Sequence, residues 1–80
     1  MKLELYHFEE CPYCAKVRSY IEKAGIQSQI KFHDIDLEPH AFDALMKLND
    51  DDQVPCLVID GKPMLESDDI IAWLKENVKA

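Results

Sequence analysis

The chain is 80 residues long, 48% of its residues are hydrophobic, and its formal net charge is −7. This length and composition predict one small globular domain over residues 1–80, without linker or disordered tail. The acidic balance argues against nucleic acid or an anionic membrane as a partner. No apolar run is long enough for a signal peptide or a membrane span, so we expect a cytoplasmic protein with reduced thiols.

The first third of the chain predicts a strand followed by a helix. Residues 3–8, LELYHF, set apolar side chains among polar ones and are typical of a buried strand. Residues 11–24 change to the helical period, with Pro12 suited to the first turn and Gly25 to the stop. The apolar stripe of this helix comprises Val17, Tyr20, Ile21 and Ala24.

A second strand and a second helix are predicted in the middle of the chain. Residues 29–35, QIKFHDI, indicate the strand. The helix covers 38–49, with Pro39 at its start and Asn49 at its stop. The stripe expected to face the core is Phe42, Leu45 and Met46.

A β-hairpin is predicted next. Residues 56–59 form a short apolar run, and Asp60-Gly61 is a strong signal for a two-residue turn. Pro63 cannot donate a ladder hydrogen bond, so the returning strand is expected at an edge of the sheet.

The last predicted element is a helix over 67–80. Ser67 is the candidate N-cap, and Asp68 and Asp69 follow in the first turn, where the helix dipole favours acidic side chains. The residues expected to face the core are Ile70, Trp73, Leu74 and Val78.

The predicted order is therefore β-α-β-α-β-β-α, an α/β fold. The first βαβ unit requires a right-handed crossover and makes strands 3–8 and 29–35 parallel. The hairpin adds an antiparallel pair. We expect a four-stranded mixed sheet with three helices packed on it.

The segment CPYC places Cys11 and Cys14 where the first strand ends and the first helix begins. The free N–H groups and the positive end of the helix dipole stabilise a thiolate at Cys11. Cys14 lies almost one turn further on, is expected to be the more buried thiol, and can close a small disulfide ring. We therefore expect an exposed nucleophile and a resolving thiol.

Two other uses of this cysteine pair remain open. A structural zinc site would need four ligands, and only Cys56 and scattered histidines could complete it. A permanent disulfide would suit an oxidising compartment. A CxxC beside a βαβ pattern favours redox chemistry over both.

The segment QVPC places Val54-Pro55 directly before an apolar strand. The simpler interpretation is a turn. The alternative is a cis peptide that exposes the backbone of Val54 beside Cys11, where an extended thiol peptide could pair with it as an added strand.

Taken in order, CPYC, the Val-Pro pair, the Asp-Gly turn and SDDI at the last helix make the whole chain resemble a glutaredoxin. The Glu66-Ser67 pair is also similar to the thioredoxin-like half of glutathione transferases, although 80 residues leave no room for their helical second domain. The resemblance implies a thioredoxin-like fold and glutathione-dependent thiol–disulfide exchange.

The resemblance also implies residue roles. Cys11 resembles the nucleophile that forms a mixed disulfide with glutathione, and Cys14 resembles the second thiol, needed for protein disulfides. Tyr13 would flank the tripeptide, and the Val54 backbone would pair with its cysteinyl group. The residues expected to bind glutathione are Tyr13, Val54, Pro55, Ser67 and Asp68, the last two at its γ-glutamyl end.

The chain departs from the glutaredoxin pattern near Cys11. Phe8 stands where many relatives carry a lysine, and Glu9 and Glu10 add negative charge that disfavours a thiolate. Lys16 is the cation expected to compensate in part. Leu65-Glu66 replaces the double glycine usual before the last helix.

These observations predict a dithiol glutaredoxin that reduces protein disulfides and glutathione mixed disulfides. No metal or dissociable cofactor is expected beyond glutathione as co-substrate. The expected partners are glutathione and disulfide-containing or glutathionylated proteins, and the expected state is a monomer. The alternatives are a dithiol carrier reduced by a flavoprotein reductase and a glutathione-ligated iron–sulfur binding module.

The remaining candidate residues have simpler interpretations. Cys56 is expected to pack in a strand, and His7 to be structural despite its closeness to Cys11. His33 and His40 are expected at the surface.

Overall fold

The structure, a computed structural model, describes residues 1–80. Its elements follow the predicted order, with one short 3-10 turn added between the first helix and the second strand. They are β1 (Leu3–His7), α1 (Pro12–Ala24), the 3-10 turn (Gln27–Gln29), β2 (Ile30–Asp34), α2 (Pro39–Asn49), β3 (Cys56–Ile59), β4 (Lys62–Met64) and α3 (Ser67–Asn77).

The four strands form one mixed sheet in the order β2-β1-β3-β4. Strand β1 pairs parallel with β2 and antiparallel with β3, so that Leu5 lies between Phe32 and Leu57. Strand β4 lies at the edge, antiparallel to β3, with Pro63 opposite Val58. The predicted fold class, the parallel pair and the hairpin are confirmed.

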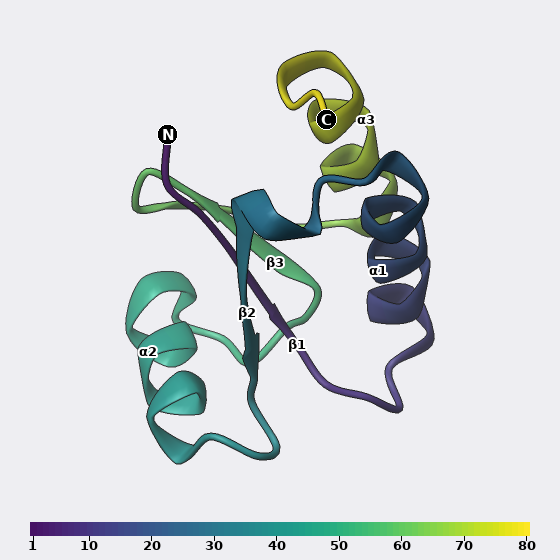
Figure 1. The fold of residues 1–80 in the computed structure, drawn as a ribbon. Helices are drawn as coiled ribbons and strands as arrows, with labels where there is room; N and C mark the ends of the chain where they lie inside the picture. Colours follow the sequence, from purple (N-terminus) through teal and green to yellow (C-terminus); the bar gives the residue numbers. More distant parts are fainter.

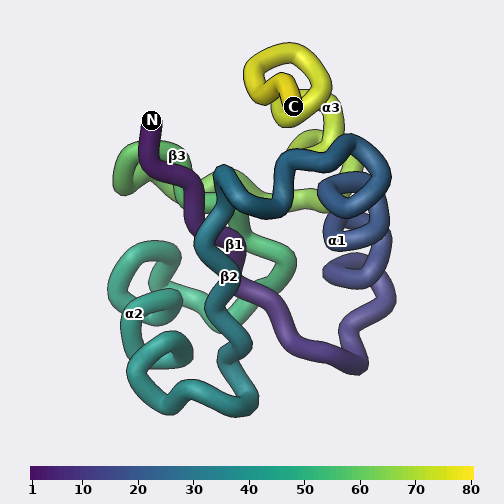
Figure 2. The backbone as a smooth tube through the Cα atoms, viewed as in Figure 1, coloured from purple at the N-terminus to yellow at the C-terminus, as the bar shows by residue number.

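Helices α1 and α3 lie on one face of the sheet, and α2 lies on the other (Figures 1 and 2). Alternation along β1 explains this division, because Leu3 and Leu5 point to the α1 and α3 side whereas Tyr6 points to α2. The sheet therefore separates two hydrophobic clusters.

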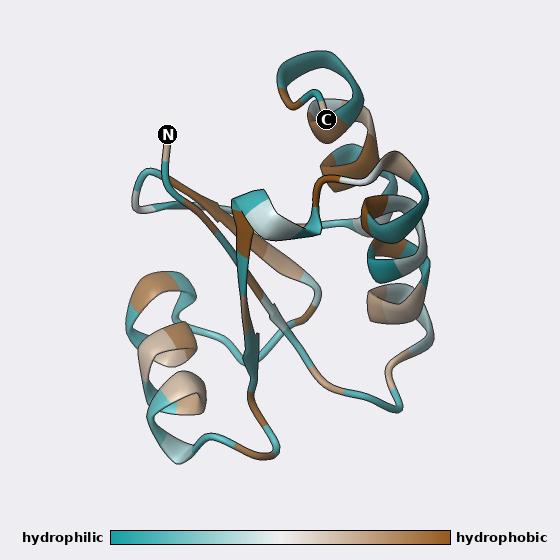
Figure 3. Cartoon of the chain, in the orientation of Figure 1, coloured by the Kyte–Doolittle hydropathy of each residue, from teal (hydrophilic) through white to brown (hydrophobic).

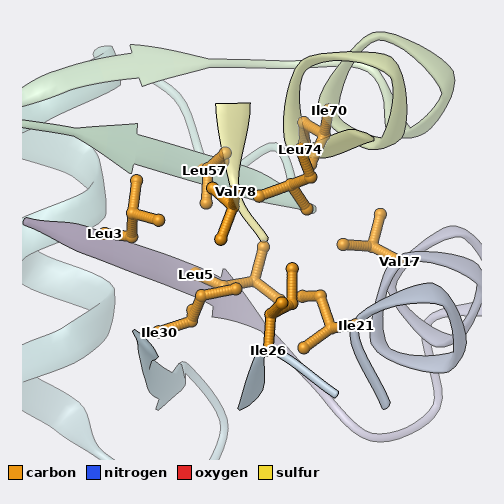
Figure 4. Packing of buried hydrophobic residues seen from close by; sticks show 10 residues of the cluster. All are labelled: Leu3, Leu5, Val17, Ile21, Ile26, Ile30, Leu57, Ile70, Leu74 and Val78. Atoms are coloured by element: carbon orange, nitrogen blue, oxygen red, sulfur yellow. The ribbon is translucent and has the colours of Figure 1, made fainter. Parts of the chain in front are cut away.

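The larger cluster fills the space between the sheet and helices α1 and α3 (Figure 4). Burying each of these side chains contributes roughly 1.5–3 kcal/mol, so the cluster is the main source of stability. Its members are Leu3, Leu5, Val17, Ile21, Ile26, Ile30, Leu57, Ile70, Leu74 and Val78. Trp73, expected in the core, packs against it but is only half-buried.

The smaller cluster lies beneath α2 and consists of Tyr6, Ala41, Leu45, Cys56 and Val58. The predicted stripe of α2 is only partly correct, because Phe42 and Met46 each stay 38% exposed. Ala41 and Leu45 face the sheet, and the residue after each is turned to the flank of the helix. In Figure 3, α2 is accordingly coloured brown over part of its length, the colour of hydrophobic residues.

The helix ends agree with the prediction except at α3. Gly25 ends α1 in the left-handed conformation with φ of 70°. Glu66, and not Ser67, is the N-cap of α3, and it has φ of 73°. The helix stops at Asn77 because Val78 is extended.

None of the helices is both long enough and apolar enough to cross a membrane.

Candidate active site

Cys11 occupies the N-cap position of α1. Its backbone is extended, with φ of −76° and ψ of 116°, and its Sγ accepts the N–H of Cys14 at 3.2 Å. Pro12 follows at the first helical position, where no N–H donor is needed. The helix end therefore directs a hydrogen-bond donor and its positive dipole at one sulfur atom.

Contrary to expectation, Cys11 is buried, with an exposure of only 6%. As the N-cap residue, it folds its side chain back over the first turn of α1 toward the N–H of Cys14. Little of Cys11 is therefore open to an incoming substrate.

Cys14 is fully buried, as predicted. Burial raises the pKa of its thiol to about 12, and its hydrogen bond with the Cys11 side chain adds to this increase. Cys14 is therefore protonated at neutral pH and is not the resting nucleophile.

Arg18, which the sequence analysis did not single out, holds the β1–α1 loop. Its Nη1 donates to the Phe8 carbonyl at 3.1 Å and lies 3.0 Å from His7 Nδ1, and its Nη2 donates to the Glu9 carbonyl at 3.2 Å. Burial, followed by the nearby guanidinium, lowers the pKa of His7. His7 therefore supports the loop as a neutral ring, consistent with its expected structural role.

The Val54-Pro55 peptide bond is cis. The sequence leaves open a plain turn or a cis peptide at Val54-Pro55, and the structure has the cis peptide. Pro55 is buried and leads directly into β3.

A cleft of about 620 Å³ opens beside the dithiol. All five residues expected to bind glutathione lie along it, although they come from three separate segments of the chain. Neither Cys11 nor Cys14 lines the cleft. Tyr13, which lies between them in the sequence and is 65% exposed, does line it. The lining residues are Tyr13, Gln53, Val54, Pro55, Glu66, Ser67, Asp68 and Asp69.

The N-terminus of α3 forms one wall of this cleft. The N–H of Ile70 donates to the Glu66 carbonyl and starts the helical ladder, so the N–H groups of the three preceding residues have no helical acceptor. Ser67 is 8% exposed, and its hydroxyl makes no hydrogen bond within the chain. This wall offers donors suited to a carboxylate.

Lys16 is the cation expected to compensate in part for the acidic residues near Cys11, and it lies beside the cleft. Its ammonium forms an ion pair with Asp68 and so links α1 to α3 at the rim of the cleft. The side chains of Lys16 and Asp68 are 54% and 80% exposed, respectively, so water screens the pair strongly.

The other candidate residues lie away from the cleft. Cys56 is fully buried in the smaller cluster, and burial raises the pKa of its thiol to about 11. His33, expected at the surface, is half-buried and stacks on Tyr6, with its Nε2 3.0 Å from Glu4 Oε1. His40 is exposed. No cluster of three or more His, Cys, Asp or Glu side chains could hold a metal ion.

Residues 5–80 match the family model described as the glutathione S-transferase N-terminal domain. The chain belongs to this family. The match agrees with the similarity seen at Glu66-Ser67, and it supports the thioredoxin-like superfamily without specifying glutaredoxins. No curated protein sequence matches the chain.

Solved structures show the same fold. A thioredoxin-like protein, 24% identical, superimposes with a TM-score of 0.76 over 94% of this chain and 97% of its own. Human glutathione-S-transferase T1-1, 28% identical, has a TM-score of 0.77 over 92% of this chain and 31% of its own. Glutathione transferase E6 from Drosophila melanogaster, 24% identical, has a TM-score of 0.77 over 98% and 36%. This chain thus spans about a third of the length of these two transferases.

Proposed function

We propose that the chain is a glutathione-dependent thiol–disulfide oxidoreductase of the dithiol glutaredoxin type. Cys11 is the nucleophile and Cys14 the resolving thiol. The observation that carries this proposal is the Cys11 sulfur at the N-cap of α1, accepting an amide hydrogen bond at 3.2 Å beside a second, protonated thiol. Membership of a glutathione-related family supports it.

The reaction with a glutathionylated substrate has two exchanges. The Cys11 thiolate attacks the glutathione sulfur, a new disulfide forms, and the substrate leaves as a thiolate that takes a proton. The thiolate of a second glutathione then attacks the sulfur bound to Cys11, releasing oxidised glutathione and restoring the Cys11 thiolate. With a protein disulfide, the Cys11 thiolate attacks one sulfur, and the other sulfur leaves as a thiolate that takes the proton of Cys14. The Cys14 thiolate then attacks the Cys11 sulfur, forming the Cys11–Cys14 disulfide, and the second substrate sulfur leaves as a thiolate that takes a proton from water. Two glutathione molecules reduce this disulfide and become oxidised glutathione.

The cleft supplies the groups for glutathione. The free N–H groups of α3 and the Ser67 hydroxyl bind the γ-glutamyl carboxylate. Asp68 binds the neighbouring ammonium once its ion pair with Lys16 opens, and the Val54 backbone pairs with the cysteinyl group. We place the protein in the cytoplasm, because glutathione keeps a dithiol reduced there, and we propose that it acts as a monomer.

A second candidate is transferase chemistry, in which glutathione is conjugated to an electrophile. The family match and the Glu66-Ser67 pair favour it. In that case the dithiol would not be essential.

The test is glutathione-dependent reduction of a small mixed disulfide, coupled to glutathione reductase, with conjugation of chlorodinitrobenzene measured in parallel. We expect the wild type and Cys14→Ser to turn over the disulfide, and Cys11→Ser to lose at least about 100-fold in rate because no nucleophile remains. An inactive wild type with ample glutathione would contradict the proposal. Reduction restored only by a flavoprotein reductase would favour a thioredoxin-like carrier, and conjugation that survives in Cys11→Ser would favour a transferase.

A further inference from the structure

Acidic residues occur both in the cleft and directly before Cys11 in the chain. Glu66, Asp68 and Asp69 line the cleft, and no lysine or arginine does. Glu9 and Glu10 are exposed and occupy the two positions before Cys11. Consecutive Cα atoms are about 3.8 Å apart, so these two carboxylates lie within a Debye length of the thiol.

The nearby cations, Lys16 and Arg18, cancel only part of this charge. The guanidinium of Arg18 is directed at the carbonyls of the β1–α1 loop and at His7. The ammonium of Lys16 is paired with Asp68. Asp69 takes part in no ion pair, and the side-chain carboxylate of Glu66 accepts only an amide hydrogen bond from Gln53 at 3.3 Å.

Two features indicate that the acidic wall receives a ligand. Ser67 as a residue is nine-tenths buried and lines the cleft, and its hydroxyl makes no hydrogen bond within the chain. The Lys16 ammonium already pairs with Asp68 on this wall, so an ammonium group fits against these carboxylates. Asp69 and Glu66 offer the same interaction to a cation from outside.

We propose that the preferred protein substrates of this dithiol are disulfides or glutathione mixed disulfides whose cysteine is flanked by lysine or arginine. The inference rests on the proposed function and adds the class of substrate. Carboxylates in the cleft and directly before Cys11 attract basic flanking residues and repel acidic ones, which changes the rate of productive encounter. The substrate is recognised through charge near its cysteine.

The test compares two glutathionylated peptides that differ only in carrying lysine or glutamate at the positions flanking the cysteine. We expect kcat/KM to be about tenfold higher for the lysine peptide at about 10 mM salt, where the Debye length is about 30 Å. The ratio should approach one at about 1 M salt, where screening acts within about 3 Å.

A matched pair of variants separates local charge from net charge. Glu9→Gln with Glu10→Gln removes two carboxylates beside Cys11, and should reduce the preference for the lysine peptide several-fold. Asp43→Asn with Glu76→Gln makes the same change of net charge on the outer faces of α2 and the end of α3, and should leave the preference unchanged.

Equal rates for the two peptides at low salt would overturn the inference and leave the proposed function standing. Equal effects of the two double variants would overturn it too, because the preference would then follow overall charge. Failure to turn over either peptide, together with failure on a small mixed disulfide, would instead contradict the proposed function.

Discussion

The three cysteines show how position assigns a role to one residue type. Cys11 accepts an amide hydrogen bond at a helix end, whereas burial keeps the thiols of Cys14 and Cys56 protonated, with pKa values of about 12 and about 11. Cys56 lies in the cluster beneath α2, on the other face of the sheet from α1. Its chemistry is therefore separate from that of the dithiol.

The raised pKa of Cys56 makes stability depend on pH. In the unfolded chain a cysteine loses its proton near pH 8.5, so between there and pH 11 the unfolded state binds fewer protons than the native state. The stabilisation by the neutral thiol is therefore complete below about pH 8.5 and is lost as pH rises. Between pH 8 and pH 10 we expect Cys56→Ala to lose about 1–2 kcal/mol less of its unfolding free energy than the wild type.

The measurement is urea unfolding at several pH values under reducing conditions. Parallel curves of unfolding free energy against pH for the two proteins would contradict this explanation. Cys14 contributes to both curves equally, so their difference isolates Cys56.

The sequence predicts the positions of Cys11 and Cys14 well, because CPYC follows an alternating strand and opens a helical period. It does not predict that Cys11 is buried, since this depends on how the N-cap side chain folds back over the helix. Arg18 was missed because its three contacts are with the preceding loop and strand, which no helical periodicity encodes.

At the scale of elements, the start of α3 combines backbone strain with the cleft. Glu66 has φ of 73° and ψ of 117°, a conformation that a residue with a Cβ rarely adopts, and it lines the cleft. Such strain persists where the surrounding structure requires it, often at a binding site.

The substitution Glu66→Gly tests this strain. Glycine adopts positive φ without steric cost, so we expect the free energy of unfolding to rise by about 1 kcal/mol after allowing for its greater freedom in the unfolded chain. The matched control Glu76→Gly lies in the last turn of the same helix and should lower it by up to about 1 kcal/mol. Equal destabilisation by both substitutions, measured by urea unfolding, would rule out strain at Glu66.

The prediction of elements was accurate where local patterns decide and weaker where packing decides. The Asp60-Gly61 turn, Pro63 at the edge strand and Gly25 after α1 agree with the structure. The exposure of Phe42 and Met46 depends on how α2 is rotated against the sheet, which its own periodicity does not determine.

At the scale of the molecule, the sheet carries the two hydrophobic clusters on its opposite faces. Strand β3 is central to this arrangement, because Leu57 is fully buried between β1 and helices α1 and α3. The same fold occurs in solved structures only 24–28% identical to this chain.

Truncation of Leu57 should therefore affect the whole domain. We expect Leu57→Ala to lower the unfolding free energy by about 3 kcal/mol, from the lost transfer energy and the cavity that remains. The control is Leu37→Ala, because Leu37 is 80% exposed and its loss should change stability by less than about 0.5 kcal/mol. A loss below about 1 kcal/mol for Leu57→Ala in urea unfolding would show that this cluster is not the main core.

The most direct test of the central claim is to capture the covalent intermediate. Cys14→Ser, mixed with a glutathionylated peptide, should form a stable mixed disulfide that intact mass spectrometry detects as one added glutathionyl group. Fragmentation should place this group on Cys11, and the double variant Cys11→Ser with Cys14→Ser should acquire none. No adduct, or an adduct on Cys56, would contradict the assignment of Cys11 as the nucleophile.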